Sequence, residues 1–211
     1  MDKLTHHSLT DWDISTPYAP VIVSDKYIST PSALCGKYVG AAWKWGYLFL
    51  KQSLSGNLVD GRFVTWIYPA IISAGLFIVY FRAQALPPVY DQPPLNCYYA
   101  DIMGGQLRLY KVVAGAKTLL GTFTLANGVG NNVWTQIRYT WWQYINEDLI
   151  TVLRIGMDVL VSGAWVNQFY YNNVDNLWAG SATNRIGFFL RSYNNVYFTW
   201  IDDTEIWKPA V

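Results

Sequence analysis

The C-terminal stretch, residues 185–207, constrains the fold of this chain more than any other segment. It contains two runs rich in aromatic and β-branched residues, 185–190 and 196–207, which are joined by the polar sequence Ser-Tyr-Asn-Asn. Such residues favour β-strands, whereas Asp disfavours them. The second run nevertheless contains Asp202 and Asp203, so this carboxylate pair needs a structural or functional reason.

Similar short runs recur along the whole chain, and helical periodicity is nearly absent. The predicted strands are residues 21–23, 47–50, 57–67, 76–82, 97–102, 106–113, 118–125, 133–142, 149–155, 159–169, 185–190 and 196–207. Many short strands separated by Gly, Asn, Asp, Pro and Ser are typical of an all-β sandwich or barrel.

Glycines mark several of the predicted turns. Gly104-Gly105 and Gly115 suit turns that need positive φ. Gly156 predicts a tight reversal at residues 155–159. These turns predict two meanders of hairpins, residues 96–125 and 133–169.

Side chains alternate between two faces in the run that begins after Trp134. The alternation places Ile137, Tyr139 and Trp141 on one face and Gln136, Arg138 and Thr140 on the other.

The composition limits the partners of the chain. Its 211 residues suffice for one substantial domain, which we assign to residues 12–211 after an N-terminal tail, residues 1–11. Charged residues make up 14% of the chain, and the net charge of +1 comes without a basic run. Nucleic-acid binding is therefore not expected, because it needs a clustered positive patch.

Cys35 and Cys97 lack a metal-ligand spacing. The sequence leaves open whether they form one long-range disulfide or two buried thiols.

Residues 63–81 carry no charge and approach the length of a membrane-spanning helix. The alternative is two buried strands with a turn through residues 69–75, since both halves are rich in strand-forming types. We expect strands and no membrane span. The N-terminus has no apolar run, so we expect no secretory signal peptide.

The order of short motifs from Trp12 to Trp207 resembles the concanavalin A-like lectin/glucanase superfamily, the jelly roll shared by laminin-G-like domains, legume lectins and family 16 glucanases. The motifs are Trp12-Asp13 and residues 29–34, 75–82, 96–102, 105–111, 134–138, 163, 185–188 and 202–206. The resemblance implies a two-sheet antiparallel β-sandwich whose members bind sugars, proteins or calcium, or hydrolyse glycans.

Hydrolysis is not expected. Glucanases of this family use a Glu-x-Asp-x-Glu strand, and neither of the two glutamates, Glu147 and Glu205, stands in that pattern. Asp203 and Glu205 are predicted to share a face at the edge-ward end of a terminal strand, which favours a structural role. The only histidines are His6 and His7, so a Ser-His-Asp triad or a histidine zinc site is not expected either.

The resemblance implies a structural calcium held by Asp202, with partners from the region of Trp12 and Asp13. Calcium takes six to eight oxygen ligands, which one Asp, carbonyls and waters can supply. The alternative is that Asp202 or Asp203 accepts backbone N–H bonds or pairs with a cation.

Sugar binding would use aromatic faces and amide side chains. The candidate glycan-binding residues are Tyr170, Tyr171, Asn173, Asp175 and Trp178 in a predicted aromatic-amide loop, residues 169–178, together with Trp142. The alternative is that these aromatics only pack the sandwich.

Three classes of function follow: a glycan-binding module, a structural or host-attachment protein of a virus or phage particle, and a glycan-cleaving enzyme. Low charge and an absent signal peptide favour a non-enzymatic, lectin-like surface protein on a virion, with glycans or other virion proteins as partners. The alternatives are an extracellular carbohydrate-binding module and a glycoside hydrolase. Homo-oligomer formation is left open.

Overall fold

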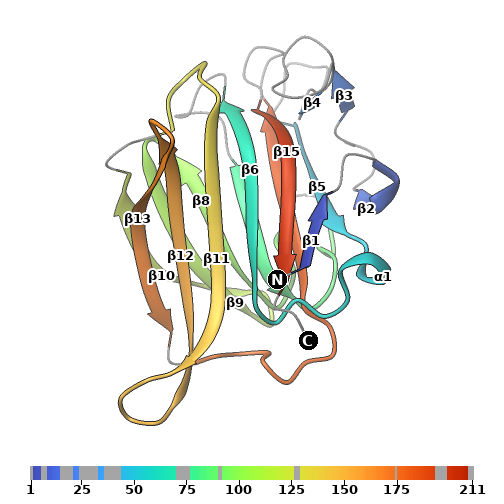
Figure 1. Cartoon of the computed structure of the whole chain (residues 1–211). Helices are drawn as coiled ribbons and strands as arrows, with labels where there is room; N and C mark the ends of the chain where they lie inside the picture. The colour runs from blue at the N-terminus through green and yellow to red at the C-terminus, as the bar shows by residue number, and fades with distance from the viewer. Residues whose placement is uncertain are drawn as a thin grey trace.

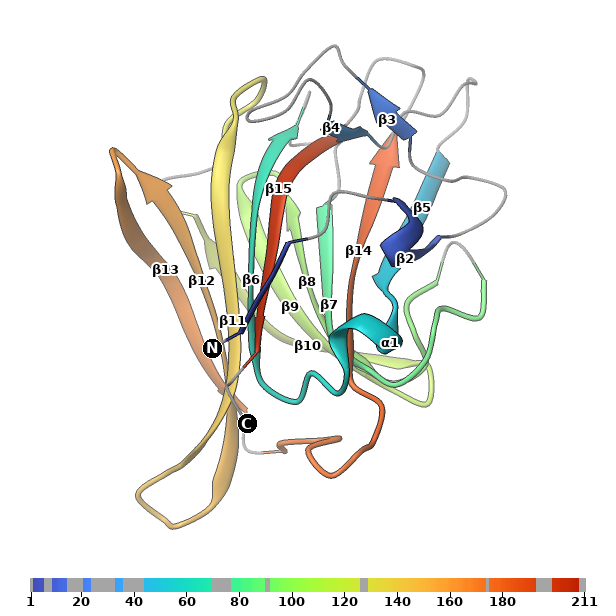
Figure 2. The same ribbon diagram turned by 45° about the vertical axis from the view of Figure 1, so that its right-hand side comes forward.

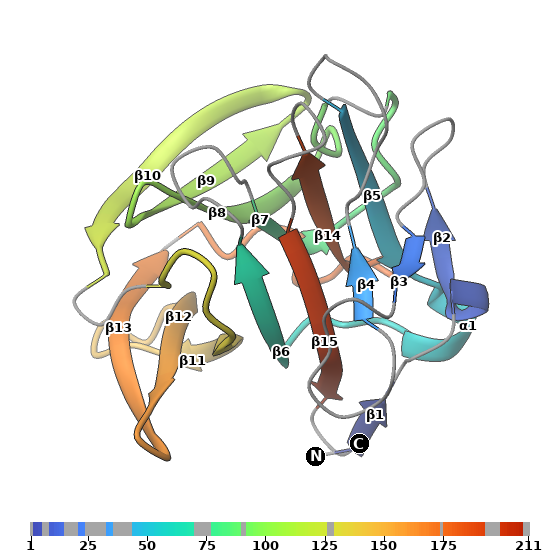
Figure 3. The ribbon, with the colours of Figure 1, turned by 90° about the horizontal axis from the view of Figure 1, so that it is seen from above.

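The structure, a computed structural model, describes residues 2–5, 9–14, 21–23, 33–35, 44–69, 77–89, 92–125, 129–173, 175–192 and 199–208. These residues form two antiparallel sheets that pack face to face, as Figures 1 and 3 show. The predicted all-β, two-sheet antiparallel sandwich is confirmed.

The first sheet, here sheet A, has the three-stranded meander at one edge. Its order is β13 (Ala164–Asn173), β12 (Thr151–Val161), β11 (Thr135–Ile145), β6 (Gly61–Pro69), β15 (Thr199–Lys208), β4 (Ala33–Cys35) and β3 (Val21–Val23), with β1 (Asp2–Thr5) also paired to β15.

The second sheet, here sheet B, has the other predicted meander at its edge. Its order is β10 (Ala116–Thr124), β9 (Gln106–Val113), β8 (Cys97–Met103), β7 (Phe77–Ala83), β14 (Arg185–Ser192), β5 (Lys44–Leu50) and β2 (Trp12–Ile14). Two short helices, η1 (Leu9–Asp11) and α1 (Gln52–Ser55), flank β2 and β5 (Figure 2).

The hydrophobic core lies between the sheets and follows the predicted alternation. On β11, Ile137, Tyr139 and Trp141 are fully buried, whereas Arg138 and Thr140 are half-buried on the other face. Because every second residue faces the core, the outer face of sheet A is free to carry polar side chains.

The outer face of sheet B carries a second cluster of buried aromatics. Phe49, Tyr80, Tyr99 and Phe189 are each at most 7% exposed, and they belong to a cluster separate from the core. The central strands of sheet B are therefore buried on both faces.

Cys97 belongs to this cluster and is a free, buried thiol. The disulfide alternative is therefore wrong for Cys97. Burial raises the pKa of its thiol well above the ordinary value, so Cys97 packs as a small hydrophobic side chain.

The predicted turns at Gly104-Gly105 and Gly115 are confirmed, but Gly156 is not a turn residue. Strand β12 continues through it, and the reversal to β13 occurs at Ser162 and Gly163, which have φ of 49° and 83°. The glycine is needed for space, because a Cβ at position 156 would lie 2.5 Å from Cδ1 of Tyr170. The ring of Tyr170 lies over Gly156 across the strand pair.

The prediction of a loop at residues 169–178 is wrong for its first half. Strand β13 runs to Asn173 and pairs with β12 throughout. The sequence Phe169-Tyr170-Tyr171 alternates between the two faces of the sheet, with Phe169 buried and Tyr170 exposed.

Two predicted strand pairs separate into different sheets. Residues 63–81 contain most of β6 and β7, as predicted, and not a membrane-spanning helix. Strand β6 belongs to sheet A and β7 to sheet B. No helix in the described residues is long and apolar enough to span a membrane. Strands β14 and β15 divide in the same way.

The prediction that Asp203 and Glu205 lie toward the edge of their sheet is wrong. Strand β15 is paired on both sides, with β6 on one side and β1 and β4 on the other. Its pairing with β1 also means that Asp2–Thr5, assigned above to an N-terminal tail, is part of sheet A. The tail residues His6 and His7 lie outside the described residues, whereas Leu9–Asp11 forms η1.

A buried arginine connects the ends of several strands. Arg82, which is 0% exposed, donates from Nε to the Val59 carbonyl at 2.7 Å and from Nη1 to Asn176 Oδ1 at 2.8 Å. It also donates to the Leu177 carbonyl and, from Nη2, to Asp60 Oδ1 at 3.3 Å. Burial lowers the pKa of Arg82, and the nearby Asp60 carboxylate opposes that shift.

Replacing Arg82 by Met should therefore destabilise the fold strongly. The substitution leaves two carbonyls, an amide and a carboxylate without their donor, so we expect a loss of about 3–5 kcal/mol in the free energy of unfolding. Urea denaturation followed by tryptophan fluorescence measures this value. The exposed cation Lys117 is the control, and Lys117→Met should change stability by less than about 0.5 kcal/mol. Equal effects of the two substitutions would contradict the role of Arg82.

Candidate functional site

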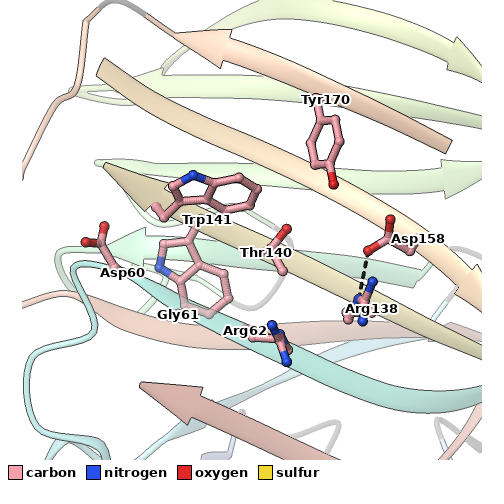
Figure 4. Close-up of a pocket in the computed structure, with 9 residues that line it drawn as sticks. Asp60, Gly61, Arg62, Arg138, Thr140, Trp141, Asp158 and Tyr170 are labelled. Atoms are coloured by element: carbon pink, nitrogen blue, oxygen red, sulfur yellow. Dashed lines mark hydrogen bonds and ion pairs between the residues drawn. The ribbon is translucent and has the colours of Figure 1, made fainter. Parts of the chain in front are cut away.

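A hollow of about 340 Å³ lies on sheet A, and most of its lining residues belong to the outer face of the sheet. We call it the outer pocket, and Figure 4 shows its labelled residues rising from neighbouring strands. It is lined by Asp60, Gly61, Arg62, Arg138, Thr140, Trp141, Trp142, Asp158 and Tyr170.

The strand register builds the floor of the outer pocket. Arg62 on β6 is opposite Thr140 on β11, Thr140 is opposite Gly156 on β12, and Gly156 is opposite Tyr170 on β13. Directly opposed residues share a face of the sheet. Small residues therefore stand in the middle of this row, with a cation at one end and an aromatic ring at the other.

The aromatic side of the outer pocket consists of Trp142 and Tyr170. Their rings meet edge to face, with centroids 5.9 Å apart. Tyr170 is 53% exposed, which is unusual for so large a side chain within a sheet. The pair thus presents accessible aromatic surface at a concave position.

Arg154 supports these two rings from the neighbouring position on β12. Its guanidinium carbon lies 5.7 Å from each of the ring centroids of Trp142 and Tyr170, and 4.3 Å from that of Tyr144. Its Nε donates to Asn172 Oδ1 at 2.8 Å. Stacking of this kind restrains both the cation and the rings, so the aromatic side is held before any ligand arrives.

The opposite side of the outer pocket contains an ion pair. Arg138 Nε donates to Asp158 Oδ2 at 2.7 Å, and Asn167 donates to Asp158 Oδ1 at 3.0 Å. The guanidinium of Arg138 also lies over the ring of Trp165, 4.4 Å from its centroid. Asp158 is only 4% exposed, so its charge is neutralised within the sheet.

Asp60 closes the end of the outer pocket near the strand termini. Its Oδ1 accepts hydrogen bonds from Arg82 and from the Gln143 backbone N–H, the latter at 3.0 Å. Arg82, the buried arginine that connects the strand ends, therefore also positions the Asp60 carboxylate.

The structure brings together two of the predicted glycan-binding residues, Trp142 and Tyr170. Tyr171 faces the other way and packs against the core, and Trp178 packs edge to face on Tyr98 at 5.1 Å. Asp175 is exposed and forms an ion pair with Lys111. Asn173 ends β13, opposite Leu153. Tyr171, Trp178 and Asp175 do not line the outer pocket.

The list of candidate binding residues omitted Arg62, Arg138, Thr140 and Asp158. The alternation along β11 was a usable signal, since it places Arg138, Thr140 and Trp142 on one face. Arg62 and Asp158 could not be found in this way, because only the pairing of β6, β11 and β12 brings them to the same position.

Asp202 lies elsewhere on sheet A, next to a bulge in β15. It is 7% exposed, and its Oδ1 accepts a hydrogen bond from the Asp203 backbone N–H at 2.9 Å. Asp203 has φ of 46°, and the register with β6 shifts between Asp202 and Glu205. Asp202 therefore accepts a backbone N–H bond, which was the alternative to calcium binding.

The expected calcium partners of Asp202 are engaged elsewhere. Asp13 lies on β2 of sheet B and forms an ion pair with Arg185. The described residues contain no group of three or more His, Cys, Asp or Glu side chains arranged to hold a metal. Calcium binding at Asp202 stays a prediction, and no cluster of further metal-ligating side chains in the described residues supports it.

Comparison with known proteins identifies the fold. No family model and no curated protein sequence matches the chain. Among solved structures, the carbohydrate recognition domain of Emp46p has a TM-score of 0.62 and 12% identity, over 96% of this chain and 90% of that one. A carbohydrate-binding module of the Dit protein from Lactobacillus casei BL23 phage J-1 has a TM-score of 0.50 and 8% identity, over 96% and 92%.

An enzyme also shares the fold. The alginate lyase of Aplysia kurodai has a TM-score of 0.53 and 14% identity, over 95% of this chain and 88% of that one. At such identities the similarity shows the fold alone. The chain has the concanavalin A-like jelly roll, as the sequence motifs predicted.

Substitution of Asp202 tests the calcium prediction. Asp202→Ala removes the acceptor of the half-buried Asp203 N–H and should lower stability by about 1–3 kcal/mol, which thermal unfolding measures as a lower Tm. If calcium binds, the decrease should be larger in millimolar calcium than in EDTA, because the ligand stabilises only the folded wild type. Equal decreases in both buffers would overturn the calcium prediction and leave the backbone role in place.

Proposed function

We propose that the chain is a lectin-like module that binds glycans in the outer pocket. The observation that carries the proposal is the pairing of Trp142 and Tyr170, two accessible rings beside polar side chains on a sheet. Aromatic rings with a polar tip serve as anchors where a ligand has both apolar and hydrogen-bonding parts. A sugar ring is such a ligand, since its C–H faces stack on aromatics and its hydroxyls bond to polar groups.

The volume and rigidity of the outer pocket support this role. About 340 Å³ lies at the small end of the range for ligand sites, roughly 300–1,000 Å³. Four neighbouring strands, β6, β11, β12 and β13, contribute the lining, so binding would need little rearrangement. A site prepared in this way loses less conformational entropy when the ligand binds.

The comparisons support the same class of ligand. Emp46p is named for its carbohydrate recognition domain, and the phage Dit module for carbohydrate binding. These names apply to those proteins, and the proposal for this chain depends on the residues of its own pocket.

Binding without catalysis is the proposed mode. Glycosidases need a carboxylic acid and a second carboxylate that flank the scissile bond. The two carboxylates of the outer pocket, Asp60 and Asp158, are already hydrogen-bonded to Arg82 and Arg138. Of the two glutamates, Glu147 is exposed in the turn after β11, and Glu205 accepts a hydrogen bond from Trp207.

The test is a glycan array followed by calorimetry on the best ligand. Trp142→Ala and Tyr170→Ala should each weaken binding at least about tenfold, since an aromatic anchor that the ligand covers contributes about 1.4 kcal/mol or more. Gly156→Ala should also weaken binding, because it retains every ring but displaces Tyr170. The control is Trp134→Ala, which removes a partner of Tyr68 outside the pocket. Undiminished binding in all three pocket variants would contradict this site.

We further propose host attachment on a virus or phage particle as the biological setting. The phage Dit module offers a precedent for this fold in a phage protein, and the low charge of the chain is compatible with a crowded surface. Mass spectrometry of purified particles should detect the chain at a constant ratio to the major structural protein. Its absence from particles, with glycan binding intact, would favour an extracellular carbohydrate-binding module instead.

A further inference from the structure

We propose that the outer pocket selects glycans that carry an anionic group, a carboxylate or a sulfate, and that Arg62 binds this group. The inference rests on the proposed glycan binding and specifies its ligand class. It comes from the one cation lining the outer pocket that has no partner within the part of the chain that the structure describes.

Arg62 lies at the end of the floor of the outer pocket, on β6. Its side chain is half-buried and lines the hollow, in which Figure 4 also shows Arg138 rising from the neighbouring strand β11. The Nε–H of Arg62 is buried and donates to no acceptor among the described residues, and the rest of its guanidinium makes no hydrogen bond or ion pair with them. A buried donor without an acceptor is uncommon and costs stability.

The other charges around the outer pocket are already matched. Arg138 pairs with Asp158, which also accepts from Asn167. Asp60 accepts from Arg82 and from the Gln143 N–H. Neither carboxylate of the pocket is therefore left to neutralise Arg62.

The carboxylate of Glu205, on the adjacent strand β15, already accepts a hydrogen bond. Trp207 is directly opposite Arg62 on β15, and Glu205 is opposite Val64. Glu205 Oε2 accepts a hydrogen bond from Trp207 Nε1 at 3.3 Å. No ion pair joins it to Arg62 in the described part of the chain.

The local charge is positive once these pairs are made. Arg62, Arg82, Arg138 and Arg154 stand in or directly behind the outer pocket, and three carboxylates, Asp60, Asp158 and Glu205, oppose them. Electrostatic attraction in a concave site with low-dielectric walls is stronger than on an open surface. The whole chain has a net charge of only +1, so this concentration is local.

The chemistry of guanidinium sets the ligand class. A planar guanidinium binds carboxylates and other oxyanions through paired, charge-assisted hydrogen bonds. From Arg62 the floor continues through Thr140 and Gly156 to the ring of Tyr170. A sugar stacked on Tyr170 and Trp142 would then direct an anionic substituent toward Arg62.

The experiment compares a hexuronate oligosaccharide with its carboxyl-reduced form of the same length and linkage, by calorimetry on the full chain. A sulfated neutral oligosaccharide forms a third arm. At least one of the two anionic sugars, the hexuronate or the sulfated sugar, should bind to the wild type about tenfold more tightly than the reduced sugar. The preference should decrease as sodium chloride is raised. Arg62→Gln should bring the ratio of the dissociation constants for the reduced and the anionic sugars close to one.

Lys117→Gln on β10 is the matched control, since it removes the same charge from an exposed position on sheet B and should leave the preference intact. Equal binding of anionic and reduced sugars by the wild type would overturn the role of Arg62 and leave the proposed function standing. Loss of the preference in Lys117→Gln as well would assign it to the overall charge and also overturn the inference. Absence of binding to any sugar would overturn the proposed function itself.

Discussion

The buried guanidinium of Arg82 is the interaction on which the arrangement at one end of the sandwich depends. Its donors reach Val59 and Asp60 before β6, and Asn176 and Leu177 after β13. Asn176 then donates to the side chain of Gln143 on β11 at 3.1 Å. Segments from both sheets are thus held by a single cation, and because Asp60 lines the outer pocket, the same contacts connect the stability of the fold with the geometry of the site.

Glycines opposite large rings form a second constraint. A Cβ on Gly61 would lie 2.5 Å from Cζ2 of Trp141, a Cβ on Gly156 would meet the ring of Tyr170, and a Cβ on Gly187 would lie 2.6 Å from the ring of Phe49. In each case an aromatic side chain lies flat over a neighbouring strand, which only glycine permits. A chain so rich in aromatics packs them on both faces of its sheets by leaving space at these positions.

This constraint explains what the sequence could and could not predict. Local patterns were sufficient for the strand composition, the Gly104-Gly105 turn and the alternation that directs Arg138 and Thr140 outward. Gly156 was interpreted as a turn because glycine in a strand usually signals a break, and its opposite residue, Tyr170, is 14 positions away. The division of β14 and β15 between sheets was equally invisible, since the pairings that decide it join residues far apart in sequence.

The two outer faces of the sandwich differ in a way that bears on where a ligand can bind. On sheet B the outward aromatics form a buried cluster, and Asp101 and Arg108 of its outer face satisfy each other through two hydrogen bonds of 2.8 Å. Burial still raises the pKa of Asp101, against the effect of Arg108. On sheet A the outward aromatics are accessible and one arginine remains without a partner among the described residues. Because a ligand gains most where surface is accessible and charge is unmatched, this difference supports the proposal that glycans bind on the face of sheet A.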